Sequence, residues 1–248
     1  MEKDIAMNHS KSSHLFPALA AGLGGIGLVL GRLQYALALD DRGLLVRGHL
    51  LSVLLCLVIP AALALALLAL PGRQEDIPAD FPKSPWAALG HGLAAVCIAA
   101  AVLTGDADKR DLTGYLWRIL GLLAALGLLA AGWQLFRGQK PGFAGYLALC
   151  LFLLSHLISH YAQWCADPQI LDYLFEMLGV GLWMLYAYYL ACCCVGLDKP
   201  RMRLATGLMA VTLCLTALGT RAGVWVCLAG AIFAGTCLYR PAHREDAP

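Results

Sequence analysis

Apolar runs of about 20 residues recur along this chain of 248 residues, and they constrain its fold more than any other feature. The chain is 60% hydrophobic and 14% charged, a balance typical of proteins that pass repeatedly through a lipid bilayer. The runs lack the strict alternation of a transmembrane β-barrel strand. The sequence therefore predicts an all-α, polytopic transmembrane helical bundle of about eight helices, with the lipid bilayer as a partner.

The expected helices can be placed along the chain from these runs. They cover residues 14–37, 50–70, 86–105, 115–136, 143–165, 170–196, 204–220 and 222–239. The last two must be joined by a very tight turn, which leaves seven spans as an alternative. Residues 1–13 are expected to form a polar N-terminal tail, residues 14–239 the transmembrane domain, and residues 240–248 a polar C-terminal tail.

Lys and Arg residues are divided unevenly between the two sides of such a bundle. With eight helices, eleven of the 18 fall on the side that holds both termini, and seven fall on the other. The positive-inside rule then predicts that both termini are cytoplasmic. The net charge is only +2, and no basic stripe is interleaved with aromatic residues, so we expect no nucleic-acid partner.

Four ionisable side chains fall inside two neighbouring apolar segments. His156 and His160 lie in LFLLSHLISHYAQW, and Asp172 and Glu176 lie in ILDYLFEMLGVGLW. Each pair has i, i+4 spacing, so its two members share one helical face. The short connection at residues 166–169 predicts an antiparallel hairpin that brings the two faces to similar depth. Ionisable groups inside a membrane are costly and typical of functional sites, so this cluster is the main candidate.

Structural explanations compete with a functional one for these residues. Asp172 can favour the positive end of its helix, and the histidines can hydrogen-bond to serines or main-chain carbonyls. Glu176 is harder to explain in this way, because it lies two turns into an apolar helix. We therefore expect a pocket in which Glu176 accepts a proton or a cation. His156 and His160 would relay protons or coordinate the ligand, and Arg118 and Asp172 would tune the charge at its mouth.

The same side chains can also hold a metal ion. Imidazole and carboxylate are the ligand set of zinc and non-haem iron, and two histidines at i, i+4 can bind one ion. His156, His160 and Glu176 are therefore candidate ligands for a divalent metal, although no complete motif such as HExxH is present. Haem is less favoured, because His91 is expected to lie nearer the opposite face, where it serves helix packing.

Three functions follow from these observations. The favoured one is binding or transport of a small polar or ionic ligand. The second is an intramembrane metal-dependent hydrolase, in which a metal-bound water attacks a lipid or an amide. The third is a noncatalytic assembly protein, whose polar cluster packs within an oligomer or against a membrane partner.

Other motifs have structural explanations. Gly22, Gly24 and Gly27 match the G-x-G-x-x-G pattern of dinucleotide-binding domains, but that pattern requires a preceding strand and a βαβ unit. Small residues at this spacing favour close helix packing instead. The ten cysteines lie almost entirely in apolar segments or at their ends, so no disulfide framework is expected. Trp117, near the start of its helix, is expected to be an interfacial anchor.

Two segments carry a resemblance to known proteins. YALALDDRGLLVRGH and SHYAQWCADPQILDYLFEMLGVGLWMLYAY resemble those of clostridial-type bacterial multi-pass membrane proteins of similar length, a group with no assigned activity. The resemblance extends over most of the chain. It implies a stand-alone helical domain in a bacterial inner membrane, and it transfers no catalytic residues.

Overall fold

The computed structural model describes residues 2–38, 49–70, 84–104, 112–164, 170–220 and 223–238. These residues form helices and no strand, so the predicted all-α class is confirmed. The helices are α1 (Glu2–Leu37), α2 (Leu50–Cys56), α3 (Val58–Ala69), α4 (Pro85–Thr104), α5 (Leu112–Phe136), α6 (Phe143–Trp164), α7 (Ile170–Cys194), α8 (Pro200–Ala217) and α9 (Val224–Leu238). α1 includes residues 2–13, which composition alone marks as a polar tail.

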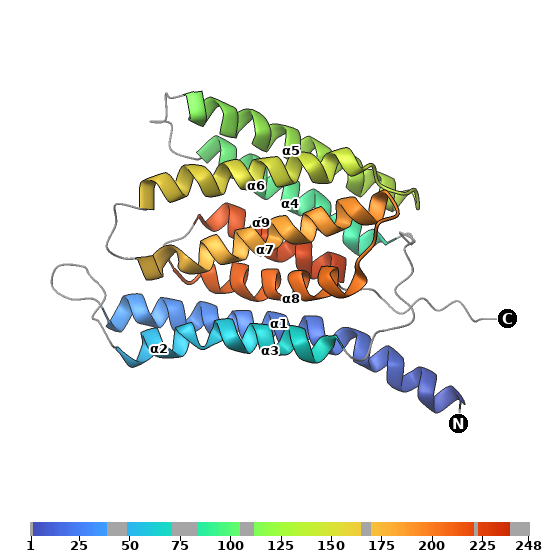
Figure 1. Cartoon of the computed structure of the whole chain (residues 1–248), viewed down its shortest axis with the longest axis horizontal. Helices are drawn as coiled ribbons and strands as arrows, with labels where there is room; N and C mark the ends of the chain where they lie inside the picture. Colours follow the sequence, from blue (N-terminus) through green and yellow to red (C-terminus); the bar gives the residue numbers. More distant parts are fainter. Residues whose placement is uncertain are drawn as a thin grey trace.

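α2 and α3 are two parts of one rod, interrupted at Leu57. Pro60 lies in the first turn of α3, and its ring nitrogen cannot donate a hydrogen bond to the carbonyl of Cys56. The missing bond explains the interruption, and the described helices therefore make eight rods. Consecutive rods run in opposite directions, so α1 begins and α9 ends at the same end of the bundle (Figure 1).

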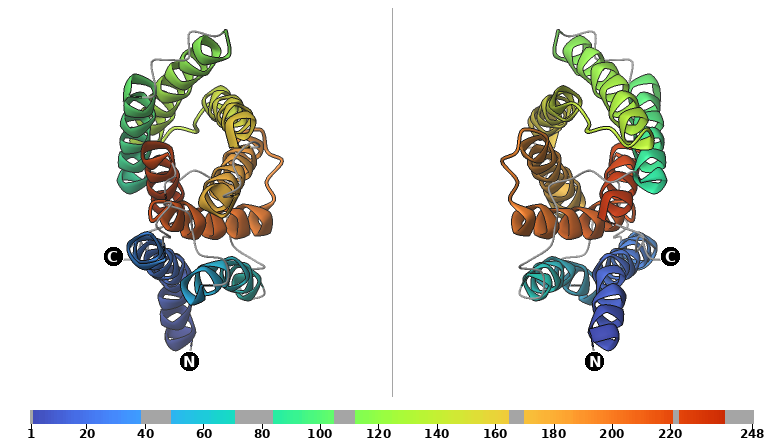
Figure 2. Two further views of the ribbon diagram at one scale, coloured as in Figure 1. Left: turned by 90° about the vertical axis from the view of Figure 1, so that its left-hand side faces the viewer. Right: turned by 90° about the vertical axis from the view of Figure 1, so that its right-hand side faces the viewer.

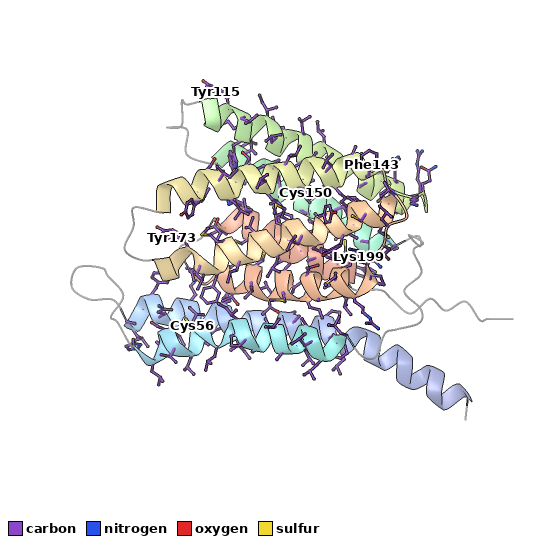
Figure 3. The ribbon with its side chains drawn as sticks, viewed as in Figure 1. Cys56, Tyr115, Phe143, Cys150, Tyr173 and Lys199 are labelled. Carbon is purple, nitrogen blue, oxygen red and sulfur yellow. The ribbon has the colours of Figure 1, made fainter. Side chains whose placement is uncertain are left out.

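The two ends of the bundle carry different connections. At the end that we call the α6–α7 end, α6 finishes and α7 starts, and the labelled side chains of Tyr115 and Tyr173 lie there (Figure 3). We call the opposite end the terminal end. The labelled side chains of Phe143 and Lys199 lie there.

Six helices, α4 to α9, form a closed ring. Each of them packs against the next, and α9 packs against α4 to close the ring (Figure 2). α1, α2 and α3 lie outside the ring, where α1 and α3 pack against α8. α8 is therefore the ring helix against which α1 and α3 pack.

Six of the rods are long and apolar enough to cross a membrane, which supports an integral, multi-pass membrane protein. They are α1, the α2–α3 rod, α4, α5, α6 and α7. α9 is apolar but shorter, and α8 carries the buried polar residues Arg203, Thr212 and Thr216. Because α1, α3, α7 and α9 cover α8, these side chains contact protein instead of lipid. α8 and α9 correspond to the last two predicted spans, for which the sequence also leaves a seven-span alternative.

Aromatic side chains fill the interior of the ring. The ring of Phe233 on α9 lies between 4.8 and 6.3 Å, centroid to centroid, from those of His91, Tyr146, Trp183 and Tyr186. All five side chains are buried. They come from α4, α6, α7 and α9, so one aromatic cluster joins four of the six ring helices.

Glycines let neighbouring helices approach closely, and two contacts illustrate this. A methyl group added to Gly127 of α5 would lie only 2.7 Å from the Cα of Gly145 on α6. On α1, a methyl group at Gly24 would lie 2.8 Å from Cβ of Leu215 on α8. The G-x-G-x-x-G segment is thus part of a packed helix, in agreement with the interpretation as a packing motif.

Candidate functional site

α6 and α7 bring three ionisable side chains together at the α6–α7 end. His156 and His160 lie one turn apart on α6, with their ring centroids 4.0 Å apart, and Glu176 comes from α7. One ligand-capable atom from each residue lies within 4.8 Å of the other two. We call these three residues the His2Glu cluster.

Both carboxylate oxygens of Glu176 are held by neighbours. Oε1 lies 3.0 Å from Nε2 of His156, in a hydrogen bond, and 3.9 Å from Nδ1 of His160. Oε2 accepts a hydrogen bond of 2.9 Å from the main-chain N–H of Gly223. Gly223 directly precedes α9, so this one carboxylate joins α7 to α6 and to the start of α9.

The cluster is buried unevenly. The side chains of His156 and Glu176 are 3% and 1% exposed, whereas that of His160 is 22% exposed. The aromatic rings of Trp117 on α5 and Phe152 on α6 lie beside His156, with centroids 6.2 and 6.3 Å away. His160 is therefore the most exposed member of the cluster, and two aromatic rings lie beside His156.

The charge of the Glu176 carboxylate needs compensation at this depth. An isolated buried carboxylate costs far more than a solvated one, so it takes a proton or a cationic partner. Within the described part of the chain, its ion-pair partners are the two histidines, and no Lys or Arg joins them. Either a protonated imidazole or a bound cation can provide the compensating charge.

Two polar atoms beside the cluster have no hydrogen-bond partner among the described residues. They are Nδ1 of His156 and Nε1 of Trp117, and both are buried. Leaving a buried polar group unpaired costs about 1–3 kcal/mol, so such atoms call for an explanation. A ligand at the cluster that accepts a hydrogen bond from the indole N–H would satisfy Nε1 of Trp117.

For two residues, Asp172 and Arg118, the role predicted in the pocket remains a prediction. Asp172 lies on α7 one turn before Glu176, but its side chain is outside the described residues, as is the connection at 165–169. Arg118 is partly buried on α5, next in sequence to Trp117. Its proposed pairing with Asp172 at the mouth of the pocket is therefore not tested by this geometry.

His91 belongs to a separate buried contact. Its Nδ1 donates to the carbonyl of Ala87 at 2.7 Å, and its Nε2 accepts from the hydroxyl of Tyr146 at 3.0 Å. The two bonds together describe a neutral imidazole that links α4 to α6. Tyr146 lies ten residues before His156 on α6, which is about 15 Å along the helix axis. His91 and His156 therefore cannot ligate one haem iron, and His91 serves helix packing as expected.

Two residues at the cluster were not predicted from the sequence. Gly223 is separated from Glu176 by 47 positions, and a glycine in a turn carries no signal for carboxylate binding. Trp117, expected to be an interfacial anchor, has its ring centroid 5.6 Å from that of Phe152 and 6.2 Å from that of His156. The one sequence signal for the contact of Trp117 with His156 is its position near the start of a helix that faces the α6–α7 hairpin.

Comparisons with protein-family models, with curated proteins and with solved structures find no match. The function is therefore argued from the chemistry and the placement of the side chains.

Proposed function

We propose that this multi-pass membrane protein binds a small cation at the His2Glu cluster. The observation that supports the proposal is the convergence of a buried carboxylate with two imidazoles, without a Lys or Arg among its described partners. A cation between the three groups would balance the carboxylate charge and accept the imidazole lone pairs. The proposal makes the predicted binding of a small polar or ionic ligand more specific.

Binding at one end is favoured over passage of the ion through the ring. Between His156 and Tyr146, α6 carries Leu149, Phe152 and Leu153, all fully buried. A conducting path needs polar groups or water along its length. These apolar side chains lie between the cluster and the terminal end, so we propose a binding site and leave transport as the alternative.

One observation favours a second candidate function, that of a metal-dependent hydrolase. Two imidazoles and one carboxylate are the protein ligands of several catalytic zinc sites, which keep a further position for water. In the remaining alternative, a noncatalytic assembly protein, the cluster would serve helix contacts alone. Cation binding separates the first two functions from the third, and cation-dependent cleavage of a lipid ester or amide separates the second from the first.

The distribution of Lys and Arg supports a placement of the cluster on one particular side of the membrane. If both termini are cytoplasmic, the α6–α7 end faces the extracytoplasmic side. We propose this orientation, and with it a bacterial inner membrane, on the basis of the charge distribution and the sequence resemblance. The cation would then be taken from outside the cytoplasm.

Thermal unfolding of the detergent-purified full chain tests the proposed function. Chlorides of Na⁺, K⁺, Ca²⁺ and Zn²⁺ are added separately to the wild type and to Glu176→Gln, which removes the charge but keeps an acceptor for the N–H of Gly223. A ligand at 100 times its Kd that binds only the folded state stabilises it by about 2.7 kcal/mol. We expect at least one cation to raise the midpoint of the wild type and not that of the variant. Equal responses of the two proteins to every cation would refute the proposal.

A further inference from the structure

We infer that the cation is a divalent transition metal of the zinc class, held by His156, His160 and Glu176 with one further position open to an oxygen ligand from outside the chain. The inference rests on the proposed function, because it names the ion of the same site. Four observations support the inference. They are the chemistry of the donor atoms, the distances between them, the hydrogen bond that holds the Glu176 carboxylate, and an indole N–H without a partner among the described residues.

The donor atoms of the cluster select against hard cations. Ca²⁺ is typically bound by six to eight oxygen ligands, and Mg²⁺ by an octahedron of oxygens. Two of the three donors here are imidazole nitrogens, which suit zinc, iron, nickel and copper. The cluster therefore favours a transition metal over an alkali or alkaline-earth ion.

The spacing of the donors matches such an ion. With metal–nitrogen and metal–oxygen distances of roughly 2.0–2.2 Å, two donors on a tetrahedral ion lie about 3.3 Å apart. The separations of Oε1 of Glu176 from His156 Nε2 and His160 Nδ1 are 3.0 and 3.9 Å, on either side of that value. All pairs lie within 4.8 Å, so small rotations of the side chains complete the geometry.

Gly223 fixes which carboxylate oxygen is available. Its N–H holds Oε2 of Glu176 at 2.9 Å, which leaves Oε1 directed at the two imidazoles. Hydrogen bonds of this kind orient the ligands of protein metal sites. A methyl group at position 223 would lie 2.9 Å from Oε1, so the absence of a side chain there keeps room for the ion.

A hydrogen-bond donor without a partner among the described residues belongs to the ring next to His156. Three protein ligands leave one coordination position of a tetrahedral ion vacant. Nε1 of Trp117 is buried without a hydrogen-bond partner among the described residues, and its ring is adjacent to His156. We infer that an oxygen ligand on the metal, such as water or a carboxylate, accepts a hydrogen bond from this indole.

Titration of the detergent-purified full chain with CoCl₂ tests the inference, because Co²⁺ occupies zinc sites and absorbs visible light strongly when it is four-coordinate. We expect a saturable visible spectrum that ZnCl₂ abolishes and that excess NaCl or CaCl₂ does not. Glu176→Gln removes the anionic ligand. His160→Ala removes the partly exposed ligand and leaves the buried core intact, so it tests the site even where a core variant fails to fold. Each should weaken Co²⁺ binding by more than the roughly 10- to 100-fold that loss of an outer-shell partner costs.

His49→Asn is the matched control. His49 lies before α2 and caps it by accepting a hydrogen bond from the N–H of Leu51, a role that asparagine also fills. The variant removes an imidazole outside the cluster, so its cobalt titration should equal that of the wild type.

The outcomes separate the inference from the function on which it rests. If Co²⁺ and Zn²⁺ do not bind but Na⁺ or Ca²⁺ stabilises the wild type and not Glu176→Gln, the inference is overturned and the proposed function stands. If no cation has any effect, both are overturned. A cobalt spectrum that is unchanged in His160→Ala and Glu176→Gln would also overturn the inference, because the metal would then lie elsewhere.

Sodium acetate added to the cobalt-loaded protein tests the open position. We expect it to change the visible spectrum of the wild type, and to do so only at higher concentration in Trp117→Phe, which retains an aromatic ring but lacks the N–H. A spectrum that acetate does not change would contradict the open position.

Discussion

Replacing Gly127 with alanine tests how closely α5 and α6 pack. The added methyl group would lie 2.7 Å from the Cα of Gly145, whereas nonbonded carbon atoms prefer separations of about 3.5–4.0 Å. Because the nearest atoms belong to the backbone, no side chain can rotate away, and the two helices must separate by about 1 Å. Overpacking of this kind costs about 1–3 kcal/mol, so we expect Gly127→Ala to lower the free energy of unfolding by about 2 kcal/mol.

Equilibrium unfolding of the helices, followed by circular dichroism in mixed micelles with increasing dodecyl sulfate, measures this change. Gly92→Ala on α4 is the control, because a methyl group at that position meets no atom within 4 Å. It should leave the free energy unchanged or raise it by up to about 1 kcal/mol through helix propensity. Gly145→Ala should resemble Gly127→Ala, since its methyl group would lie 2.7 Å from the carbonyl oxygen of Gly127. Equal stabilities of the Gly127 and Gly92 variants would refute the close packing.

Three further substitutions give separate tests. Gly223→Ala should weaken Co²⁺ binding at least about tenfold, because the methyl group displaces the Glu176 carboxylate; an unchanged titration would contradict this. Tyr146→Phe removes the hydroxyl that donates to His91 and leaves a buried acceptor, so unfolding should become easier by about 1–3 kcal/mol with no effect on Co²⁺ binding. Arg203→Met breaks a buried ion pair of 3.2 Å with Asp198 at the terminal end, and should lower stability by about 3 kcal/mol while the cobalt titration is unchanged; a fully stable variant would contradict the pairing.

The helices could be predicted wherever contact with lipid demands a long apolar run. Residues 143–165 and 170–196 correspond closely to α6 and α7 for this reason. The interruption at Leu57 follows from a single missing hydrogen bond at Pro60, which a hydropathy pattern does not register. The enclosure of α8 could not be predicted either, since it depends on which helices pack around it.

The candidate site could be predicted only in part. Spacing of four residues places His156 and His160 on one face of α6, but it does not decide which neighbour that face meets. That choice depends on the rotation of α6 against α5 and α7, which contacts such as Gly127 with Gly145 determine. The hydrogen bond from Gly223 joins positions far apart in the sequence, so no local pattern reveals it.

The central claim is that His156, His160 and Glu176 form one cation site in the folded chain. Elemental analysis of the detergent-purified full chain, equilibrated with micromolar ZnCl₂ and then separated from free metal, tests it most directly. The wild type and His49→Asn should each retain close to one zinc ion per chain, and the double variant His156→Ala, His160→Ala should retain almost none. Equal zinc content in the wild type and the double variant, whether high or near zero, would contradict the claim.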